Sequence, residues 1–266
     1  MGYYTLDRFK FFCSDHDHCN HPPSVAATLI NIQHGHGMPV CTAGFWYLCT
    51  KGLEIEGFCG LISVMFKNVT IIGDGAMGSV CAILLCEKGI AARMWGYDAT
   101  QLAEMAAAKE NKKFLPGYTL PGTLVFNADD ATVFDGTDMI VSAVPCQFVR
   151  GVWGRLKKYV PAGVPIVSVA KGIENKTLLR PTEVLAEVLG AHTACAALSG
   201  PTIADELARK LPATALAASV DEKLAQKVQR TFNIGWLRVY TNTDIVGVEL
   251  AGAMKNVIAI AAGIVD

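Results

Sequence analysis

The chain contains the stretch NVTIIGDGAMG at residues 68–78. Strand-forming residues come first, glycines follow at Gly73, Gly75 and Gly78, and an amphipathic helical segment occupies 79–88. A strand, a glycine turn and a helix in this order form a binding site for the pyrophosphate of a dinucleotide. The first glycine permits the tight turn, the second lets the backbone approach the phosphates, and the third lets the helix pack on the strand. The alternative is an ordinary glycine-rich turn, since this spacing also occurs by chance.

The bulk composition narrows the class of protein. The chain has 266 residues, enough for one large or two modest domains, and its net charge of -1 suggests neither nucleic acid nor an anionic membrane surface as a partner. The most apolar stretch, 245–265, carries Glu249 and Lys255, which argues against a membrane span. No basic region followed by an apolar core opens the chain, and its 9 cysteines are irregularly spaced. We therefore expect free thiols and a cytoplasmic location.

Residues 1–67 differ in composition from the rest of the chain. Five of the 6 histidines and five of the 9 cysteines precede Met65. This resembles a metal site, but no Cys-x-x-Cys pair occurs and the spacing fits no zinc-finger register. We expect no metal, with a metal-binding module as the alternative. Because the first strand begins just after Met65, our hypothesis is that residues 1–64 are an upstream extension from a misplaced start, or a poorly ordered tail.

From residue 68 onward, expected strands and helices alternate. The strands are expected at 68–73, 90–95, 138–144, 165–170, 195–199, 214–218 and 236–240. The helices are expected at 77–88, 98–110, 147–158, 180–189, 201–209 and 221–232. This alternation predicts an α/β fold: a Rossmann-type, doubly wound and mostly parallel sheet with helices on both faces, over residues 68–242.

A last helix is expected to begin at Thr243 or Asp244, either of which can cap it, and to run to the end of the chain. Its apolar residues exceed a single stripe, which suits a helix buried inside a second domain. These residues are Val246, Leu250, Val257, Ile258 and Ile264. We expect residues 243–266 to be the first helix of an incomplete, all-α second domain.

Four further motifs follow the glycine turn in order. They are Lys171-Gly172-Ile173-Glu174, Leu198-Ser199-Gly200-Pro201-Thr202-Ile203-Ala204, the run from Val239 to Leu250, and Lys255-Asn256-Val257-Ile258-Ala259. Over residues 68–266 they resemble NAD(P)-dependent glycerol-3-phosphate dehydrogenase, the soluble enzyme that interconverts dihydroxyacetone phosphate and sn-glycerol 3-phosphate. The resemblance implies NAD or NADP as cofactor, a small-molecule substrate, a role in glycerophospholipid synthesis and, in the complete enzyme, a homodimer.

The resemblance also implies roles for individual residues. The cofactor would bind Gly73, Gly75, Ala76, Met77, Gly78, Tyr97, Lys171 and Ala204. The substrate would bind Lys171, Gly200, Thr202, Lys255 and Asn256. Lys171 also has a physical reading of its own, because it follows a strand at the edge of the sheet where ligands bind in open α/β folds. A solvated loop lysine is the alternative for Lys171, and an ordinary strand-to-helix turn is the alternative for Gly200 and Thr202.

Lys255 is the predicted catalytic residue. Its neighbours at three- and four-residue spacing are small or apolar, which leaves room for a ligand and partly removes water from the ammonium group. Lys255 would then exchange a proton with the substrate hydroxyl. The alternatives are a lysine that extends from a core helix to solvent and one that pairs with Glu249.

The chain departs from the family pattern in several places. Ala76 and Met77 stand where the family commonly has a hydroxyl residue and an aromatic, and Tyr97 occupies a position that is often basic. Asp98 follows slightly late and Arg93 lies within the strand, so the choice between NAD and NADP stays open. The family's Gly-Leu-Gly-Asp and Arg-Asn motifs are absent, so we expect poor turnover by this chain alone. A related hydroxy-acid dehydrogenase and a catalytically silent NAD(P)-binding fragment are the alternatives.

Overall fold

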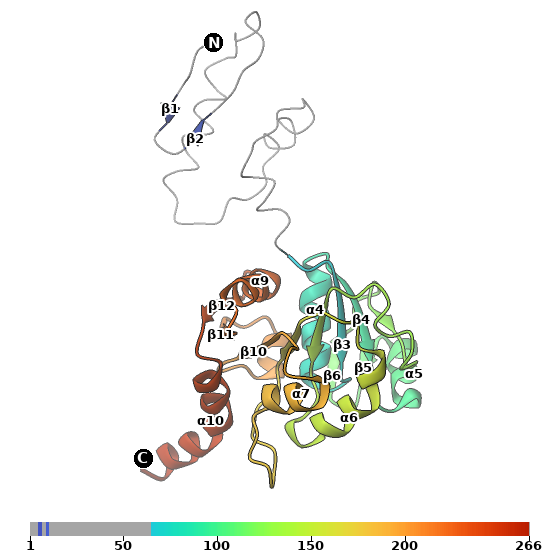
Figure 1. The fold of residues 1–266 in the computed structure, drawn as a ribbon. Coiled ribbons are helices and arrows are strands. Elements are labelled where there is room, and N and C mark those ends of the chain that lie inside the picture. Colours follow the sequence, from blue (N-terminus) through green and yellow to red (C-terminus); the bar gives the residue numbers. More distant parts are fainter. Residues whose placement is uncertain (1–4, 7–8, 11–64, 266) are drawn as a thin grey trace, which may run out of the picture. The chain divides into compact units, whose positions relative to one another are not determined.

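A computed structural model describes residues 5–6, 9–10 and 65–265 (Figure 1). The chain divides into two units, Met1–Ser63 and Val64–Asp266. In the first unit, β1 (Thr5–Leu6) pairs antiparallel with β2 (Phe9–Lys10). The cysteine and histidine cluster that we weighed as a metal site lies outside the described residues. The fold described below is that of the second unit.

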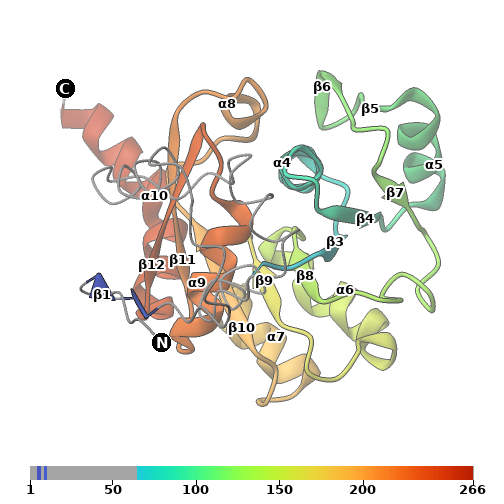
Figure 2. The same ribbon diagram turned by 90° about the horizontal axis from the view of Figure 1, so that it is seen from above.

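One sheet of eight strands forms the centre of the second unit (Figure 2). The strands lie in the order β12-β11-β10-β9-β8-β3-β4-β7. In chain order their bounds are β3 Asn68–Ile72, β4 Ala91–Trp95, β7 Val125–Phe126, β8 Met139–Ser142, β9 Ile166–Ser168, β10 Cys195–Ser199, β11 Ala213–Ala218 and β12 Leu237–Asn242. All seven predicted strands are confirmed, including the alanine-rich strand β11.

The sheet is mostly parallel, as expected, with one exception. Strand β11 runs antiparallel to β10, while β11 and β12 are parallel to each other. The connection from β10 to β11 contains only the five-residue helix α8 (Ala204–Ala208), so the chain reverses direction at one edge of the sheet. The sequence did not predict β7 or the hairpin of β5 (Glu110–Asn111) and β6 (Leu115–Thr119). These strands are short or contain Pro-Gly, and they lack clear alternation.

Six further helices connect or cover the strands. They are α4 Ala76–Glu87, α5 Ala99–Ala108, α6 Val149–Leu156, α7 Pro181–Leu189, α9 Glu222–Phe232 and α10 Ile245–Val265. Two 3-10 turns, η1 (Cys146–Phe148) and η2 (Lys157–Tyr159), flank α6 and complete the helix predicted at 147–158. The helix predicted at 201–209 is wrong at its start. Helix α8 begins only at Ala204, because the Thr202 amide donates to the Gly200 carbonyl (2.8 Å) and Ile203 has an extended backbone.

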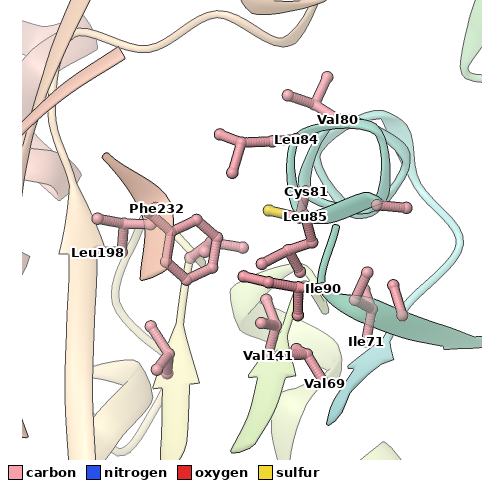
Figure 3. Close-up of a cluster of buried hydrophobic side chains, with 14 of the residues drawn as sticks. Val69, Ile71, Val80, Cys81, Leu84, Leu85, Ile90, Val141, Leu198 and Phe232 are labelled. Carbon is pink, nitrogen blue, oxygen red and sulfur yellow. The ribbon is translucent and has the colours of Figure 1, made fainter. Parts of the chain in front are cut away.

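Alternate residues of the central strands point to opposite faces of the sheet, which are covered by different helices. Ile71 of β3 packs into the cluster that contains residues of α4, α5, α8 and α9, while Ile72 packs into the cluster that contains residues of α6 and α7. Figure 3 shows the first cluster, where Leu84 and Leu85 of α4 face Phe232 of α9. This two-sided covering is the doubly wound arrangement that the sequence predicted.

Helix α10 begins as predicted, since the Gly247 amide donates to Asp244 Oδ1 (2.8 Å). Only Val248 and Glu249 of this helix are buried. The apolar residues that were expected to face a second domain are exposed in the described part of the chain. They are Val246, Leu250, Val257, Ile258 and Ile264. Within residues 65–265, α10 is the one helix whose length and composition would allow it to cross a membrane, a test that core helices of soluble proteins also pass. The absence of a membrane span therefore stays a prediction.

Candidate functional site

The glycine turn joins β3 to α4. Gly73 has φ +115°, and a Cβ placed on it would lie 2.6 Å from the Ala143 carbonyl oxygen. A Cβ on Gly78 would collide with the Gly73 carbonyl oxygen. Gly75 differs: it is the N-cap of α4 with φ −74°, and an added Cβ would meet no atom of the described residues within 4 Å. The fold therefore requires glycine at 73 and 78, but not at 75.

A buried asparagine that the sequence did not single out supports this turn. Asn111 donates through Nδ2 to the Asp74 carbonyl oxygen (2.8 Å) and to Ser79 Oγ (2.8 Å). Asn111 is fully buried, and the two hydrogen bonds from its side-chain amide link the β5–β6 hairpin to the turn. The residue was missed because β5 is only two residues long and leaves no periodic signal.

The start of α4 packs near the loop that follows β10. Ala76 and Met77 are partly buried against the core, and so is Ala204 at the start of α8. Met77 and Thr202 both line a small apolar cavity of ≈ 30 Å³. The glycine turn and the loop 200–204 therefore belong to one region of the unit.

The loop after β4 presents an exposed aromatic ring. Tyr97 is 67% exposed and meets Trp95 edge-on, with ring centroids 6.3 Å apart. The Arg155 guanidinium lies 5.1 Å from the Trp95 ring centroid and 5.3 Å from that of Tyr97, and it pairs with Asp130 (2.6 Å). Tyr97 thus forms, with Arg155, a stacked surface beside the end of β4.

Lys171 follows β9 and is fixed by the loop after β10. Its Nζ donates to the Thr202 carbonyl oxygen (2.9 Å) and to Thr202 Oγ1 (3.0 Å). Burial lowers the pKa of Lys171, and repulsion from Lys255 lowers it further. Two of the predicted site residues, Lys171 and Thr202, are therefore in contact at the carboxyl edge of β9 and β10, and the positive charge of the third, Lys255, acts on Lys171.

Helix α10 reaches this edge because it carries a glycine where it meets β10. A Cβ on Gly252 would lie 2.6 Å from Ser199 Oγ and 3.7 Å from Lys171 Cγ. Gly252 lies three residues before Lys255 and is one of the small neighbours that were predicted to leave room for a ligand. The contact with Ser199 depends on how α10 docks, which no local pattern specifies.

The other two predicted substrate residues have different surroundings. A Cβ on Gly200 would lie 2.7 Å from the Thr214 carbonyl oxygen, so glycine at 200 is required by packing against β11. Asn256 has an exposed side chain next to Lys255 on α10. Among the described residues from 65 onward, no group of three or more potential metal ligands was found, and the absence of a metal stays a prediction.

A buried ion pair anchors α10 on the sheet unit. Glu249 accepts from Arg180 Nη1 (2.6 Å), from the Thr182 amide (3.0 Å) and from Thr182 Oγ1 (2.6 Å). Burial raises the pKa of Glu249, and the bonds from Thr182 and Arg180 oppose that rise. Both carboxylate oxygens of Glu249 are thus bonded to Arg180, which precedes α7, and to Thr182 in α7. The alternative in which Glu249 pairs with Lys255 is wrong.

Comparisons with known proteins agree with this arrangement. The family described as NAD-dependent glycerol-3-phosphate dehydrogenase matches through its N-terminal part at residues 68–225 and through its C-terminal part at residues 244–266. A glycerol-3-phosphate dehydrogenase [NAD(P)+] of Anaeromyxobacter dehalogenans is 44% identical over 201 residues, which are 75% of this chain and 60% of the relative. The corresponding protein of Geobacter sulfurreducens is 43% identical over 204 residues, covering 76% and 61%.

Solved structures give the same family. The glycerol-3-phosphate dehydrogenase of Coxiella burnetii aligns with a TM-score of 0.69 and 33% identity, covering 74% of this chain and 60% of that one. The yeast glycerol-3-phosphate dehydrogenase aligns with a TM-score of 0.65 and 29% identity, covering 74% and 62%. The chain thus spans about 60% of the length of these relatives. On this evidence the chain belongs to the NAD-dependent glycerol-3-phosphate dehydrogenase family.

Proposed function

We propose that this chain supplies the dinucleotide-binding domain and the acid/base lysine of an NAD(P)-dependent glycerol-3-phosphate dehydrogenase. Residues 68–242 would bind the cofactor, and residues 243–266 would begin the substrate domain. We further propose that the complete enzyme is a cytoplasmic homodimer that acts in glycerophospholipid synthesis. The family membership supports these proposals, and the geometry of the glycine turn supports cofactor binding independently.

Gly75 is the observation that carries the proposal. Glycine at 73 and at 78 is explained by backbone conformation and close packing, but at 75 an alanine would fit. A glycine that the fold does not need is explained by a ligand that comes close to the backbone. The open space beside Gly75 lies at the N-terminus of the twelve-residue helix α4, where N–H groups and the helix dipole attract a phosphate.

The residues around the turn fit a dinucleotide. The nucleotide would extend from the exposed Tyr97 beside β4, across Gly75, toward Lys171 and Ala204. When bound, the nicotinamide would exchange a hydride with C2 of sn-glycerol 3-phosphate or dihydroxyacetone phosphate. Asn111 would hold the turn in its binding conformation through its bonds to Asp74 and Ser79.

Lys171 and Lys255 would act on the substrate. Two ammonium groups at one edge of the sheet favour an anionic ligand, because each lowers the energy of a negative charge placed between them. Thr202 orients Lys171 through two hydrogen bonds, so Lys171 would position a substrate oxygen. Lys255 would give a proton to the C2 oxygen or take one from it, with Gly200, Thr202 and Asn256 completing the substrate site.

The test is a titration of the purified chain with NADH and NADPH, followed by the same titration of Gly75→Ala. We expect the chain to bind a dinucleotide and the variant to bind at least about tenfold more weakly, because the methyl group occupies the position of a phosphate oxygen. The variant should keep its fold, with an unfolding free energy within about 1 kcal/mol of the parent.

Gly154→Ala is the matched control, because a Cβ there, on the exposed face of α6, also meets no atom of the described part of the chain within 4 Å. It should bind like the parent. A Gly75→Ala variant with unchanged affinity would contradict the proposal, as would a parent chain that binds neither dinucleotide. Dinucleotide binding without oxidation of glycerol 3-phosphate would limit the function of this chain to cofactor binding.

A further inference from the structure

The side chain of Asp74, the residue between the first two glycines of the turn, reaches the end of strand β4. A Cβ on Gly96, which follows β4, would lie 2.8 Å from Asp74 Oδ2, so the carboxylate rests directly against the Gly96 backbone. Gln101 Nε2 donates to the same oxygen (2.9 Å) and fixes its direction. The Asp74 carboxylate is therefore held at the carboxyl end of β4, which is the second strand of the nucleotide-binding unit after β3.

This is the place where dinucleotide-binding folds distinguish the two nicotinamide cofactors. An acid at the end of the second strand accepts a hydrogen bond from the 2′-hydroxyl of the adenosine ribose, whereas a basic residue there accommodates a 2′-phosphate. Asp98 is the acidic residue in the loop that follows β4. Its carboxylate caps α5 by accepting hydrogen bonds from the amides of Thr100 (2.9 Å) and Gln101 (3.3 Å). The carboxylate that lies against this strand end comes from the glycine turn instead.

The cations near this strand end are mostly engaged elsewhere. Arg93 Nη1 donates to the carbonyl oxygens of Val133 (2.8 Å) and Asp135 (2.9 Å). Arg155 pairs with Asp130 and lies over two aromatic rings. Within the described part of the chain, Lys113 is the remaining cation that we consider as a partner for a 2′-phosphate. Its Nζ donates to Gln101 Oε1 (2.8 Å), while the nitrogen of the same side-chain amide donates to Asp74.

We propose that Asp74 is a specificity residue that makes this chain prefer NAD(H) over NADP(H). The inference rests on the proposed function, since it needs the glycine turn to hold a dinucleotide. A carboxylate has about four acceptor positions, so one bond from Gln101 leaves capacity for a ribose hydroxyl. The same negative group repels a 2′-phosphate, which carries negative charge and needs a cationic partner.

The test compares the Kd values of NADH and NADPH for the parent chain, Asp74→Asn and Asp74→Ala. We expect the parent to bind NADH at least about tenfold more tightly than NADPH, because like charges at contact distance disfavour the phosphate form. Both variants should bind NADPH about tenfold more tightly than the parent does, so that the preference disappears. Asp74 has no positive φ, so both substitutions suit its backbone, and thermal unfolding of each variant checks the fold.

Two controls separate the contribution of Asp74 from other effects. Glu104→Gln removes one exposed negative charge from α5 and should leave the NADH to NADPH ratio unchanged. Lys113→Ala should also leave the preference for NADH in place. Equal affinities, a preference for NADPH in the parent, or an unchanged preference in both Asp74 variants would overturn the inference while leaving the proposed function intact. A parent chain that binds neither dinucleotide would overturn both.

Discussion

Gly252 of α10 lies in contact with Ser199 at the end of β10: a Cβ added to Gly252 would be 2.6 Å from Ser199 Oγ. Glycine in the interior of a helix costs about 1 kcal/mol relative to alanine. Here it allows the helix that carries Lys255 to approach the strand edge that carries Lys171. A larger residue at position 252 would push α10 away from β10, and Lys255 would then lie farther from Lys171.

Gly252→Ala is expected to lower the free energy of unfolding by about 1–2 kcal/mol, because the overpacked contact outweighs the better helix propensity of alanine. Adding Ser199→Ala removes the hydroxyl that the methyl group meets, so the double variant should recover most of this loss. Urea unfolding of the two single variants and the double variant measures the coupling.

Gly263→Ala is the control for this cycle, because it lies in the same helix and its added Cβ meets no atom within 4 Å among the residues that the structure describes. It should stabilise the chain by about 0.5–1 kcal/mol, as helix propensity alone predicts. If Gly252→Ala stabilises the chain by the same amount, α10 does not dock on β10 as described.

Glu249→Gln is expected to lower the unfolding free energy by about 2 kcal/mol. The variant loses the charge that faces Arg180, whose side chain is only 12% exposed, and the second partner of Arg180, Glu183, compensates only in part. Hydrogen exchange of the α10 amides should accelerate, because the bonds from Arg180 and Thr182 anchor that helix. Glu187→Gln, whose parent side chain is 56% exposed and pairs with Arg150, should change stability by less than about 0.5 kcal/mol.

Cys81 and Cys195 are expected to resist alkylation in the folded chain. Burial raises the pKa of each thiol to about 12, and the negative charge of Glu249 adds to the rise for Cys195, so very little of the reactive thiolate is present at pH 8. Mass spectrometry of peptides after iodoacetamide treatment at pH 8 measures this directly. Both residues should react fully once the chain is unfolded in guanidinium. Rapid alkylation of either one in the folded chain would mean that it is not shielded as described.

The sequence predicts the parts of the fold that depend on residues close together in the chain. The spacing of Gly73, Gly75 and Gly78 after an apolar run predicts β3, the turn and α4, and the alternation of apolar segments predicts the remaining long strands. The direction of β11 was not predictable, because an apolar run fits a parallel and an antiparallel neighbour equally well. The start of α8 was misplaced because Pro201 suits a first helical turn as well as a loop.

The candidate site is only partly visible in the sequence for a related reason. Lys171, Thr202 and Lys255 were predicted from motifs. The roles of Asn111 and Asp74, in contrast, depend on partners that lie 22 or more residues away, such as Gly96 and Ser79. The docking of α10 likewise depends on Glu249 meeting Arg180, a pair separated by 69 residues. Such contacts are fixed by the tertiary fold and leave no periodic signal.

Lys255→Met is expected to raise the pKa of Lys171. Burial and the positive charge of Lys255 both lower that pKa, and the variant removes the second cause while leaving the first. Because the pKa of folded Lys171 lies below its unfolded value, its contribution to stability is present at high pH and is lost as the pH falls through the folded pKa. In the variant this loss should be complete at a higher pH and be smaller in total, because the folded pKa lies closer to the unfolded value. NMR titration of the chain with ¹³C-labelled lysine measures the shift, and Lys255→Arg, which keeps the charge, should leave the pKa of Lys171 low. An unchanged pKa in Lys255→Met would show that the two ammonium groups do not interact, and would remove the electrostatic argument that they share one anionic substrate.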